Sequence, residues 1–271
     1  MPATYPSPAM PRFRLLVAYD GTDFHGWQRQ EPPDAPALRT VQGVLEEAVA
    51  TALGGPRVPV MGASRTDAGV HAVGQVAAFT ADTRIPIDRL AMAITARLPE
   101  DVCVHRAEEV HAGFAPISDC VSKCYRDTIA HGVAAPDPAL LFARRTTWVT
   151  RHRLDVAAMR AVAGRLTGTH DFAAFAQANH GRESTVRSVF GCTVHEPAPG
   201  RAVVEVSGNG FLYNMVRIIA GTLVEAGRGR IGAAEVDAAL AERDRAKVGP
   251  TLPPHGLRLE WVRYGAELDT P

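Results

Sequence analysis

The sequence predicts an α+β protein built from two similar halves, each with the element order β-α-β-β-α-β. Three observations support this fold class. Segments with alternating apolar residues and segments with helical periodicity follow one another in that order twice along the chain. Stretches rich in Gly and Pro separate these segments. The 271 residues are 46% hydrophobic and 21% charged, a composition typical of a globular protein with a large core.

The first half begins with a strand over residues 12–19, where β-forming residues alternate with others. Thr40 fits an N-cap, so residues 41–53 are predicted to form an amphipathic helix that ends at Gly54. The segment 62–71 is polar and glycine-flanked, which is typical of a loop. The other elements expected in this half are strands 58–61, 75–80 and 102–107 and a helix over 85–98 with Pro86 in its first turn.

The second half repeats this order with insertions. A strand is predicted over residues 122–131, and a helix over 154–166 has Asp155 near its start. The further elements expected are strands 186–195 and 202–207, which form a hairpin around Pro197 and Gly200, helices 211–226 and 233–243, and a strand over 257–264.

The repeated order is the split β-α-β, or ferredoxin-like, pattern, in which an antiparallel sheet carries its helices on one face. Two such halves can join their sheets edge to edge into one mixed, mainly antiparallel sheet with a central cleft, where substrate sites are common. The expected organisation is a flexible N-terminus over residues 1–11, an N-terminal subdomain with the polar loop over 12–112, a C-terminal subdomain over 113–265, and a tail over 266–271.

Charge and composition limit the class of protein. Lys+Arg and Asp+Glu each number 29, so the zero net charge gives no support for a broad basic surface. The 4 cysteines lack C-x-x-C spacing, and we expect reduced thiols. The N-terminus does not resemble a signal peptide, and the most apolar stretch, residues 215–226, is too short to span a bilayer. These features predict a cytoplasmic protein without a membrane partner.

Motifs of several enzyme classes are absent or out of context. Residues 227–232 match G-x-G-x-x-G, but they follow a predicted helix and not a strand, so a helix C-cap is the better interpretation. No P-loop pattern occurs, and we expect no nucleotide cofactor. Residues 62–66 begin like a nucleophile elbow with Ser64 at its centre, but the final Gly is missing, which disfavours a serine hydrolase. The 10 histidines show neither H-x-x-x-H nor H-E-x-x-H spacing, so no metal is expected.

The segment 62–72 carries Arg65 and Asp67 in a short polar run. Residues two apart in an extended segment point the same way, so the guanidinium is expected beside the carboxylate. Such a carboxylate stays ionised at neutral pH and is a candidate nucleophile or base. The alternative is a structural Arg–Asp pair that stabilises a turn. A lone loop histidine such as His71 is more often a hydrogen-bonding scaffold residue than a ligand or base.

A second segment, residues 20–30, contains Phe24, Trp27, Gln28 and Arg29 in a loop that also carries glycine. This mixture of aromatic, amide and guanidinium groups is suited to stacking and polar contact with RNA. Alternatively, the two aromatic rings fill the core.

A third segment places Arg217 among the apolar residues of the helix predicted over 211–226. A buried or half-buried arginine needs a partner. A carboxylate in the cleft would serve as that partner.

Together these pieces resemble the tRNA pseudouridine synthase A family, from about residue 12 to residue 264. The run Arg65-Thr-Asp-Ala-Gly-Val-His71 is the most specific element of the resemblance. The other matching motifs are Asp20-Gly21, Gly26-Trp27-Gln28, Thr40-Val41-Gln42, Gly74-Gln75-Val76, Gly168-Thr-His-Asp-Phe172, Phe175, Met215-Val-Arg217 and Pro254-His-Gly-Leu257.

The resemblance implies the pseudouridine synthase fold and a cofactor-free isomerase that acts as a homodimer. It implies that the substrates are uridines of the tRNA anticodon stem-loop, at positions 38, 39 and 40, which become pseudouridine. By matching position, Asp67 is the catalytic aspartate and Arg65 its partner, which can fill the gap left by a flipped base. The same matching makes Tyr125 the active-site tyrosine, Arg217 the arginine that pairs with Asp67, and Leu257 a wall of the pocket. The residues expected to contact RNA are Phe24, Trp27, Gln28, Arg29 and His71.

Two short stretches depart from the family pattern. Where relatives read F-H-A-R, this chain has Phe114-Ala-Pro-Ile117, and where they commonly read Y-R-Y it has Tyr125-Arg126-Asp127. A His, an Arg and an aromatic are missing and an acid is present, so RNA affinity or site selection is expected to differ. Two alternatives stay open: a synthase with a narrower or different RNA target, and an RNA-binding relative that has lost catalysis.

Overall fold

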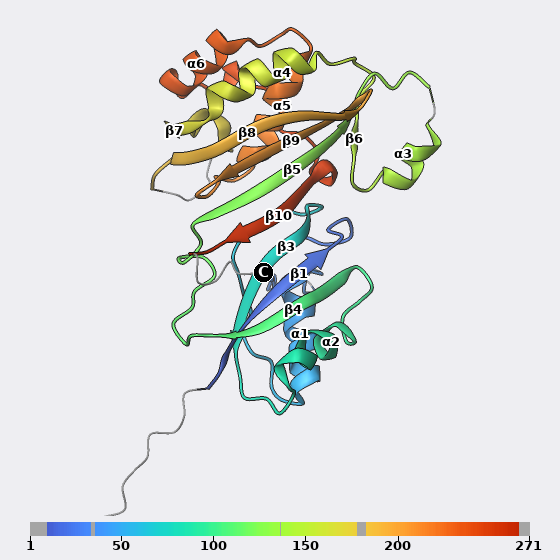
Figure 1. Cartoon of the computed structure of the whole chain (residues 1–271), viewed down its shortest axis with the longest axis vertical. Coiled ribbons are helices and arrows are strands. Elements are labelled where there is room, and N and C mark those ends of the chain that lie inside the picture. Colours follow the sequence, from blue (N-terminus) through green and yellow to red (C-terminus); the bar gives the residue numbers. More distant parts are fainter. Residues whose placement is uncertain (1–9, 34–35, 136, 178–182, 266–271) are drawn as a thin grey trace, which may run out of the picture.

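The first half of the molecule is a four-stranded sheet with two helices (Figure 1). The computed structural model describes residues 10–33, 36–135, 137–177 and 183–265. The elements of this half are β1 (Arg12–Tyr19), α1 (Val41–Leu53), β2 (Met61–Gly62), β3 (His71–Thr80), α2 (Ile87–Thr95) and β4 (Val102–Val110). β1 lies between β3 and β4 and is antiparallel to both, while β2 pairs with the other edge of β3.

Local sequence signals account for α1. The Thr40 side chain accepts a hydrogen bond from the Gly43 amide, which satisfies one of the free N–H groups of the first turn. At the other end, Gly54 takes a left-handed conformation with φ 67°, which glycine adopts without strain. Val41, Leu45 and Val49, spaced by four residues, form the buried face that packs on the sheet.

The second half has the same order of elements with insertions. Its helices and strands are β5 (Ser122–Ala130), α3 (Pro138–Ala143), β6 (Trp148–Val149), α4 (Val156–Ala163), β7 (Gly168–Asp171), β8 (Val186–Ala198), β9 (Arg201–Gly208), α5 (Met215–Gly227), α6 (Ala233–Glu242) and β10 (Leu257–Arg263). Short 3-10 helices cover Gly164–Leu166, Ala173–Phe175, Arg245–Lys247 and Pro254–Gly256. β5 lies between β10 and β9 and is antiparallel to both.

The two halves share one strand order, β4-β1-β3-β2 in the first and β10-β5-β9-β8 in the second. They are joined where β3 and β10 run parallel, with Arg258 opposite His71 and Leu259 opposite Ala72. The described strands thus form one 10-stranded sheet, in which the parallel pairs are β3–β10 and β5–β6. This confirms the predicted α+β class with one mixed, mainly antiparallel sheet.

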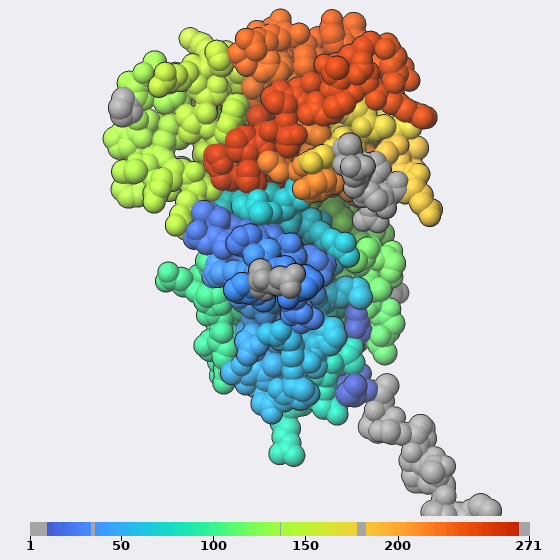
Figure 2. Space-filling model, turned by 180° about the vertical axis from the view of Figure 1, so that it is seen from behind, coloured from blue at the N-terminus to red at the C-terminus, as the bar shows by residue number. Residues whose placement is uncertain are grey.

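The helices cover one face of this sheet. In Figure 1, α1 and α2 lie behind β1 and β4. Seen from the opposite side in Figure 2, the blue segment of α1 and the orange to red segment of α6 lie on the visible surface. α5 is the most deeply buried helix, with 11 of its 13 residues buried, so its few polar side chains are held in fixed surroundings.

The structure corrects several predicted boundaries. The strand predicted over residues 58–61 is reduced to β2, and β3 begins at His71 and not at residue 75. The helix predicted from residue 85 begins at Ile87, because Pro86 is its N-cap residue.

The start of α5 is the correction with the largest consequence for the cleft. The helix predicted from residue 211 begins at Met215, because Asn214 has a left-handed backbone with φ 61° that cannot continue helical geometry. Three short elements that the sequence did not predict are α3, β6 and β7.

Of the N-terminus predicted to be flexible, residues 1–11, the structure describes only residues 10 and 11, and the predicted tail 266–271 lies outside the described residues. The division at residue 112 stays a prediction. Within the described part of the chain, no helix has the length and apolar character needed to cross a membrane.

Candidate active site

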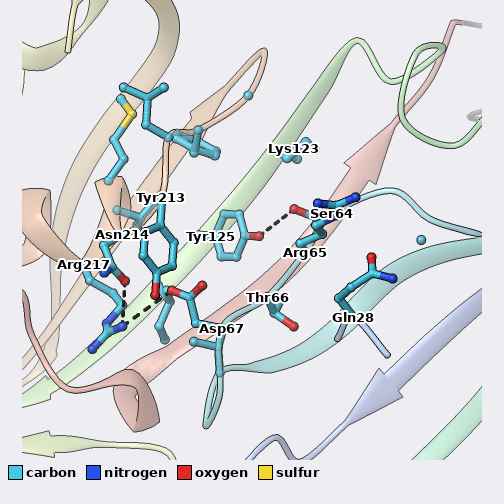
Figure 3. A pocket seen from close by; sticks show the side chains of 18 of the residues that line it. Gln28, Ser64, Arg65, Thr66, Asp67, Lys123, Tyr125, Tyr213, Asn214 and Arg217 are labelled. Atoms are coloured by element: carbon cyan, nitrogen blue, oxygen red, sulfur yellow. Dashed lines mark hydrogen bonds and ion pairs between the residues drawn. The ribbon is translucent and has the colours of Figure 1, made fainter. Parts of the chain in front are cut away.

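A cleft of about 1090 Å³ lies where the two halves meet. Its walls come from the segment before β3, from β5 and β10, and from the segment that leads into α5 (Figure 3). The residues from this set that carry the chemistry are Ser64, Arg65, Asp67, Tyr125, Tyr213, Asn214, Arg217 and Leu257. The expected central cleft is therefore present, and it collects side chains that are far apart in the sequence.

The loop that carries Asp67 is fixed by its neighbours on both sides of the residue. Thr66 shares a hydrogen bond of 2.7 Å with the Tyr19 hydroxyl, and its carbonyl accepts from the Trp27 amide at 3.0 Å. Gly26, with φ 90°, lies so close that an added β-carbon would be 2.7 Å from the Thr66 carbonyl oxygen. Only glycine allows this approach, so the Gly26-Trp27 segment acts as a rigid support for Asp67.

Asp67 forms an ion pair with Arg217 across the cleft, as expected from the sequence. The Arg217 Nη1 atom lies 3.5 Å from Asp67 Oδ2, and the two side chains are 16% and 26% exposed. Arg217 is also held by its Nε–H, which donates to the Leu252 carbonyl at 2.7 Å, and by Nη1, which donates to Asn214 Oδ1 at 2.8 Å. The partner of Asp67 is therefore an arginine with fixed geometry (Figure 3).

Burial raises the pKa of Asp67 above its ordinary value of 3.8, and the nearby Arg217 opposes that rise. The sequence had suggested that Arg65 would be the neighbouring cation. The structure corrects this, because Arg65 is exposed and forms no ion pair with Asp67 or with any other residue in the described ranges. A half-buried carboxylate with a raised pKa binds a proton more tightly than a free aspartate, which suits a base or nucleophile.

Tyr125 and Leu257 form the walls beside this carboxylate. The Tyr125 hydroxyl shares a hydrogen bond of 2.8 Å with Ser64 Oγ, and its ring meets the Phe211 ring edge-on at 5.6 Å between centroids. Burial raises the pKa of Tyr125, so its phenol is neutral at physiological pH. Leu257 is only 4% exposed and adds an apolar surface. The cleft thus offers a planar ring both an apolar and an aromatic wall.

The aromatic residues of the 20–30 segment do not line the cleft. Phe24 and Trp27 are 3% and 1% exposed. An added β-carbon on Gly62 would lie 2.3 Å from the Trp27 ring, and the Arg39 guanidinium covers the Phe24 ring at 3.9 Å. The structure corrects the expectation that they stack on RNA, since neither ring presents a free face, and it favours the core-filling alternative.

The other residues expected to contact RNA are divided between core and surface. His71 is 3% exposed, and its Nδ1 atom accepts from the Gly21 amide at 3.0 Å, so it acts as a scaffold residue. Arg29 is paired with the buried Glu46 at 2.6 Å. Gln28 is exposed and lines the cleft.

The structure also brings residues to the cleft that the sequence did not single out for it. Lys123 lines the cleft, and its Nζ donates to the Ala63 carbonyl at 3.0 Å. Tyr213 is 49% exposed at the same cleft. The signal for Tyr213 and Asn214 was their position four and three residues before Arg217. Lys123 had no signal.

No group of three or more His, Cys, Asp and Glu side chains within the described ranges could hold a metal ion. The cysteines at 103, 120, 124 and 192, all within the described ranges, form no disulfide.

Comparison with known proteins places this geometry in a family. A family model described as tRNA pseudouridine synthase matches residues 15–115 and 162–265, which include Asp67, Arg217 and Leu257. A tRNA pseudouridine synthase A from Ruminiclostridium cellulolyticum is 43% identical over 94% of this chain and 100% of its own length. The protein of the same name from Geotalea uraniireducens is 41% identical over 94% of this chain and 100% of its own length.

A further relative of that name, from Halalkalibacterium halodurans, is 42% identical over 92% of this chain and 90% of its own length. Among solved structures, a chain in the crystal structure of a Cbf5-Nop10-Gar1 complex has a TM-score of 0.32 at 12% identity, covering 91% of this chain and 57% of its own. That likeness is too low to bear on the argument. On the family model and the three relatives, the chain belongs to the tRNA pseudouridine synthase family.

Proposed function

We propose that this protein isomerises uridine to pseudouridine in tRNA, with Asp67 as the essential catalytic carboxylate. The observation that carries the proposal is the ion pair of the half-buried Asp67 with Arg217 inside the cleft, and both residues fall within the family match. A carboxylate in this position meets the substrate directly, while its partner controls its charge.

The reaction needs only what the cleft supplies. The bond between N1 and C1′ of uridine breaks, the uracil turns, C5 bonds to C1′, and a proton leaves C5 while N1 gains one. Atoms and electrons balance without a redox partner or a group donor. Asp67 can attack the sugar, add to the base, or remove a sugar proton, and all three roles need its ionised form.

Other residues that line the cleft have supporting roles. Tyr125 and Leu257 bound the space for the base with an aromatic and an apolar wall. Arg65 is exposed at the cleft and without an ion-pair partner in the described ranges, which suits a contact with RNA or the gap left by a flipped nucleotide. Of the residues in the 20–30 segment expected to contact RNA, Gln28 is exposed at the cleft, which suits a polar contact with RNA.

The finer features of the activity rest on the resemblance of the Arg65–His71 run and the accompanying motifs. They are the anticodon stem-loop as target, positions 38, 39 and 40 as the uridines modified, a homodimeric assembly, and a cytoplasmic location. Anticodon stem-loops with a single uridine at each position would separate this target from a narrower one. No product on any tRNA substrate would favour a binding relative without catalysis.

The decisive experiment replaces Asp67. Asp67→Asn keeps the shape and removes the charge, and Asp67→Ala removes both. We expect both variants to fold, to bind tRNA and to form no pseudouridine in single-turnover reactions with excess folded enzyme. The matched control is Asp88→Asn, because that carboxylate is 73% exposed and lies outside the cleft, and it should react like the wild type.

A purely structural Asp67 would give a different result. Its loss would lower the free energy of unfolding by about 1–3 kcal/mol and leave the folded fraction active. Substantial pseudouridine from Asp67→Ala would therefore contradict the proposed mechanism.

A further inference from the structure

Asn214 has an unusual backbone at a position that matters for the cleft. Its φ of 61° and ψ of 5° place it in the left-handed region, which only Arg243 shares among the described non-glycine residues. Non-glycine residues rarely adopt this conformation, and asparagine tolerates it better than most. Such outliers persist where the surrounding contacts require them.

The Asn214 side chain does not serve the helix that it precedes. A residue at the N-cap ordinarily has an extended backbone and accepts a hydrogen bond from an amide of the first turn. Asn214 is the N-cap residue of α5, yet it makes no such bond. Its amide is directed toward Arg217 on the next turn, so the left-handed backbone aims this side chain at the cleft (Figure 3).

Both ends of the Asn214 amide are engaged. Its Oδ1 accepts from Arg217 Nη1 at 2.8 Å, and its Nδ2 donates to Gln177 Oε1. The orientation of the amide is defined, because a guanidinium can only donate and must therefore face the oxygen. The backbone N–H of Gln177 also donates to the Tyr213 carbonyl at 3.2 Å, so two hydrogen bonds connect the segment at Gln177 to the segment before α5.

The same Arg217 nitrogen contacts Asn214 and Asp67. Leu252 holds the Arg217 guanidinium only through Nε, whereas Nη1 is placed by Asn214 Oδ1 and faces Asp67 Oδ2. A guanidinium held by hydrogen bonds at two nitrogens has a defined plane, whereas a guanidinium held at one nitrogen can rotate about that bond. We propose that Asn214, held in place by Gln177, is a positioning residue that fixes the guanidinium of Arg217 against Asp67. This inference rests on the proposed function of Asp67.

Two substitutions test the proposal. Asn214→Gly removes the amide but keeps the left-handed backbone, which glycine adopts without strain. Gln177→Ala removes the support of that amide from an exposed position, where the fold is not at risk. The matched control is Arg243→Gly, which relaxes the other left-handed residue and breaks its surface ion pair with Asp171 away from the cleft.

We expect Asn214→Gly to lower kcat for pseudouridine formation by about tenfold with KM within about twofold of the wild type, because misplaced catalytic groups slow the chemical step. Gln177→Ala should lower kcat in the same way by about threefold. Arg243→Gly should leave both constants unchanged. Wild-type kcat in both Asn214→Gly and Gln177→Ala would overturn the proposal, and if Asn214→Gly does not fold, Gln177→Ala decides.

A second measurement does not depend on catalysis. The pKa of the Asp67 carboxyl can be followed by carbon-detected NMR, with Asp67→Asn identifying its resonance. A loosened Arg217 opposes the rise in pKa less, so the pKa of Asp67 should be higher in Asn214→Gly than in the wild type. An unchanged pKa would overturn the proposal. A wild-type protein that forms no pseudouridine would instead refute the proposed function, while this titration would still test the role of Asn214.

Discussion

Asp67 and Asp127 are two carboxylates under the influence of one arginine, but their surroundings differ. Asp67 is 26% exposed to the cleft and pairs with Arg217 at 3.5 Å. Asp127, on β5, is fully buried, and neither of its oxygens has a hydrogen-bond partner in the described structure. A β-carbon added to Gly256 would lie 2.4 Å from Asp127 Oδ1, so the backbone packs closely against that oxygen.

Burial raises the pKa of both carboxyls, and Arg217 opposes the rise in each. For Asp127 the result is a pKa of about 7. A perturbed pKa alone therefore does not identify the catalytic group of this protein. Asp67 combines its raised pKa with access to substrate, whereas Asp127 has no such access. When Asp127 ionises, its buried charge destabilises the folded protein.

The largest effect is expected from Arg217→Ala, which removes the cation that the two carboxyls share. The single-turnover rate should fall by about 100-fold, since a charge that contacts the reacting group is lost. As the pH is lowered, the rate is expected to fall when Asp67 becomes protonated. Because Arg217 no longer opposes the rise in pKa, this fall should begin at a higher pH in the variant. A rate profile over pH 4–9 measures both effects.

The control for Arg217→Ala is Arg228→Ala, at the other end of α5. Arg228 is 18% exposed and pairs with Glu225 at 2.7 Å, so its loss breaks an ion pair of similar burial outside the cleft. This control should keep the wild-type rate profile. If Arg217→Ala did the same while folded, the ion pair with Asp67 would have no part in the reaction.

A smaller effect, on stability, is expected from Asp127→Asn. Between about pH 4 and pH 7 the unfolded chain has this carboxyl ionised while the folded protein keeps it protonated. The folded state then binds more protons, so the free energy of unfolding falls as the pH rises and levels off above about 7. The variant lacks this group, and its stability should decline less over that range, by about 4 kcal/mol.

Urea unfolding at pH 4, 6 and 8 measures this difference. Comparing the change with pH, and not the stability at one pH, cancels the cost of burying the new amide. Asp88→Asn is the matched control, since it removes an exposed carboxyl. An equal pH dependence in wild type and Asp127→Asn would show that Asp127 is ionised and solvated in the folded state.

The smallest effect is expected from Asp127→Asn on catalysis. Because Asp127 is closed off from the cleft, the single-turnover rate should stay within about twofold of the wild type, and it should fall over the same range of low pH. If the substitution instead moved the pH at which the rate falls, that fall would reflect protonation of Asp127, and its assignment to Asp67 would be wrong.

The sequence predicted features that depend on local signals. The helix α1 has the bounds expected from Thr40 and Gly54, because a side-chain cap and a left-handed glycine act within one turn. The ion pair of Arg217 with Asp67 was predictable because an arginine among apolar helix residues requires a buried anion.

Features that depend on distant contacts were missed. The expectation that Arg65 would hold Asp67 relied on their spacing and ignored the competing Arg217. The burial of Phe24 and Trp27 depends on Gly62 and Arg39, which pack on them from other segments. The late start of α5 follows from Asn214, whose conformation is set by contacts with Gln177 and Arg217 and not by its own propensity.

The position of β10 has a consequence for how the protein is made. β10 follows every other strand in the sequence, yet it lies between β3 and β5 in the middle of the sheet. The ribosome synthesises the chain from its N-terminus. β3 in the first half and β5 in the second therefore each keep an unpaired edge until β10 has been synthesised. Leu257, at the start of β10, also completes the wall of the cleft. The nascent chain therefore has no finished substrate pocket until translation has passed β10.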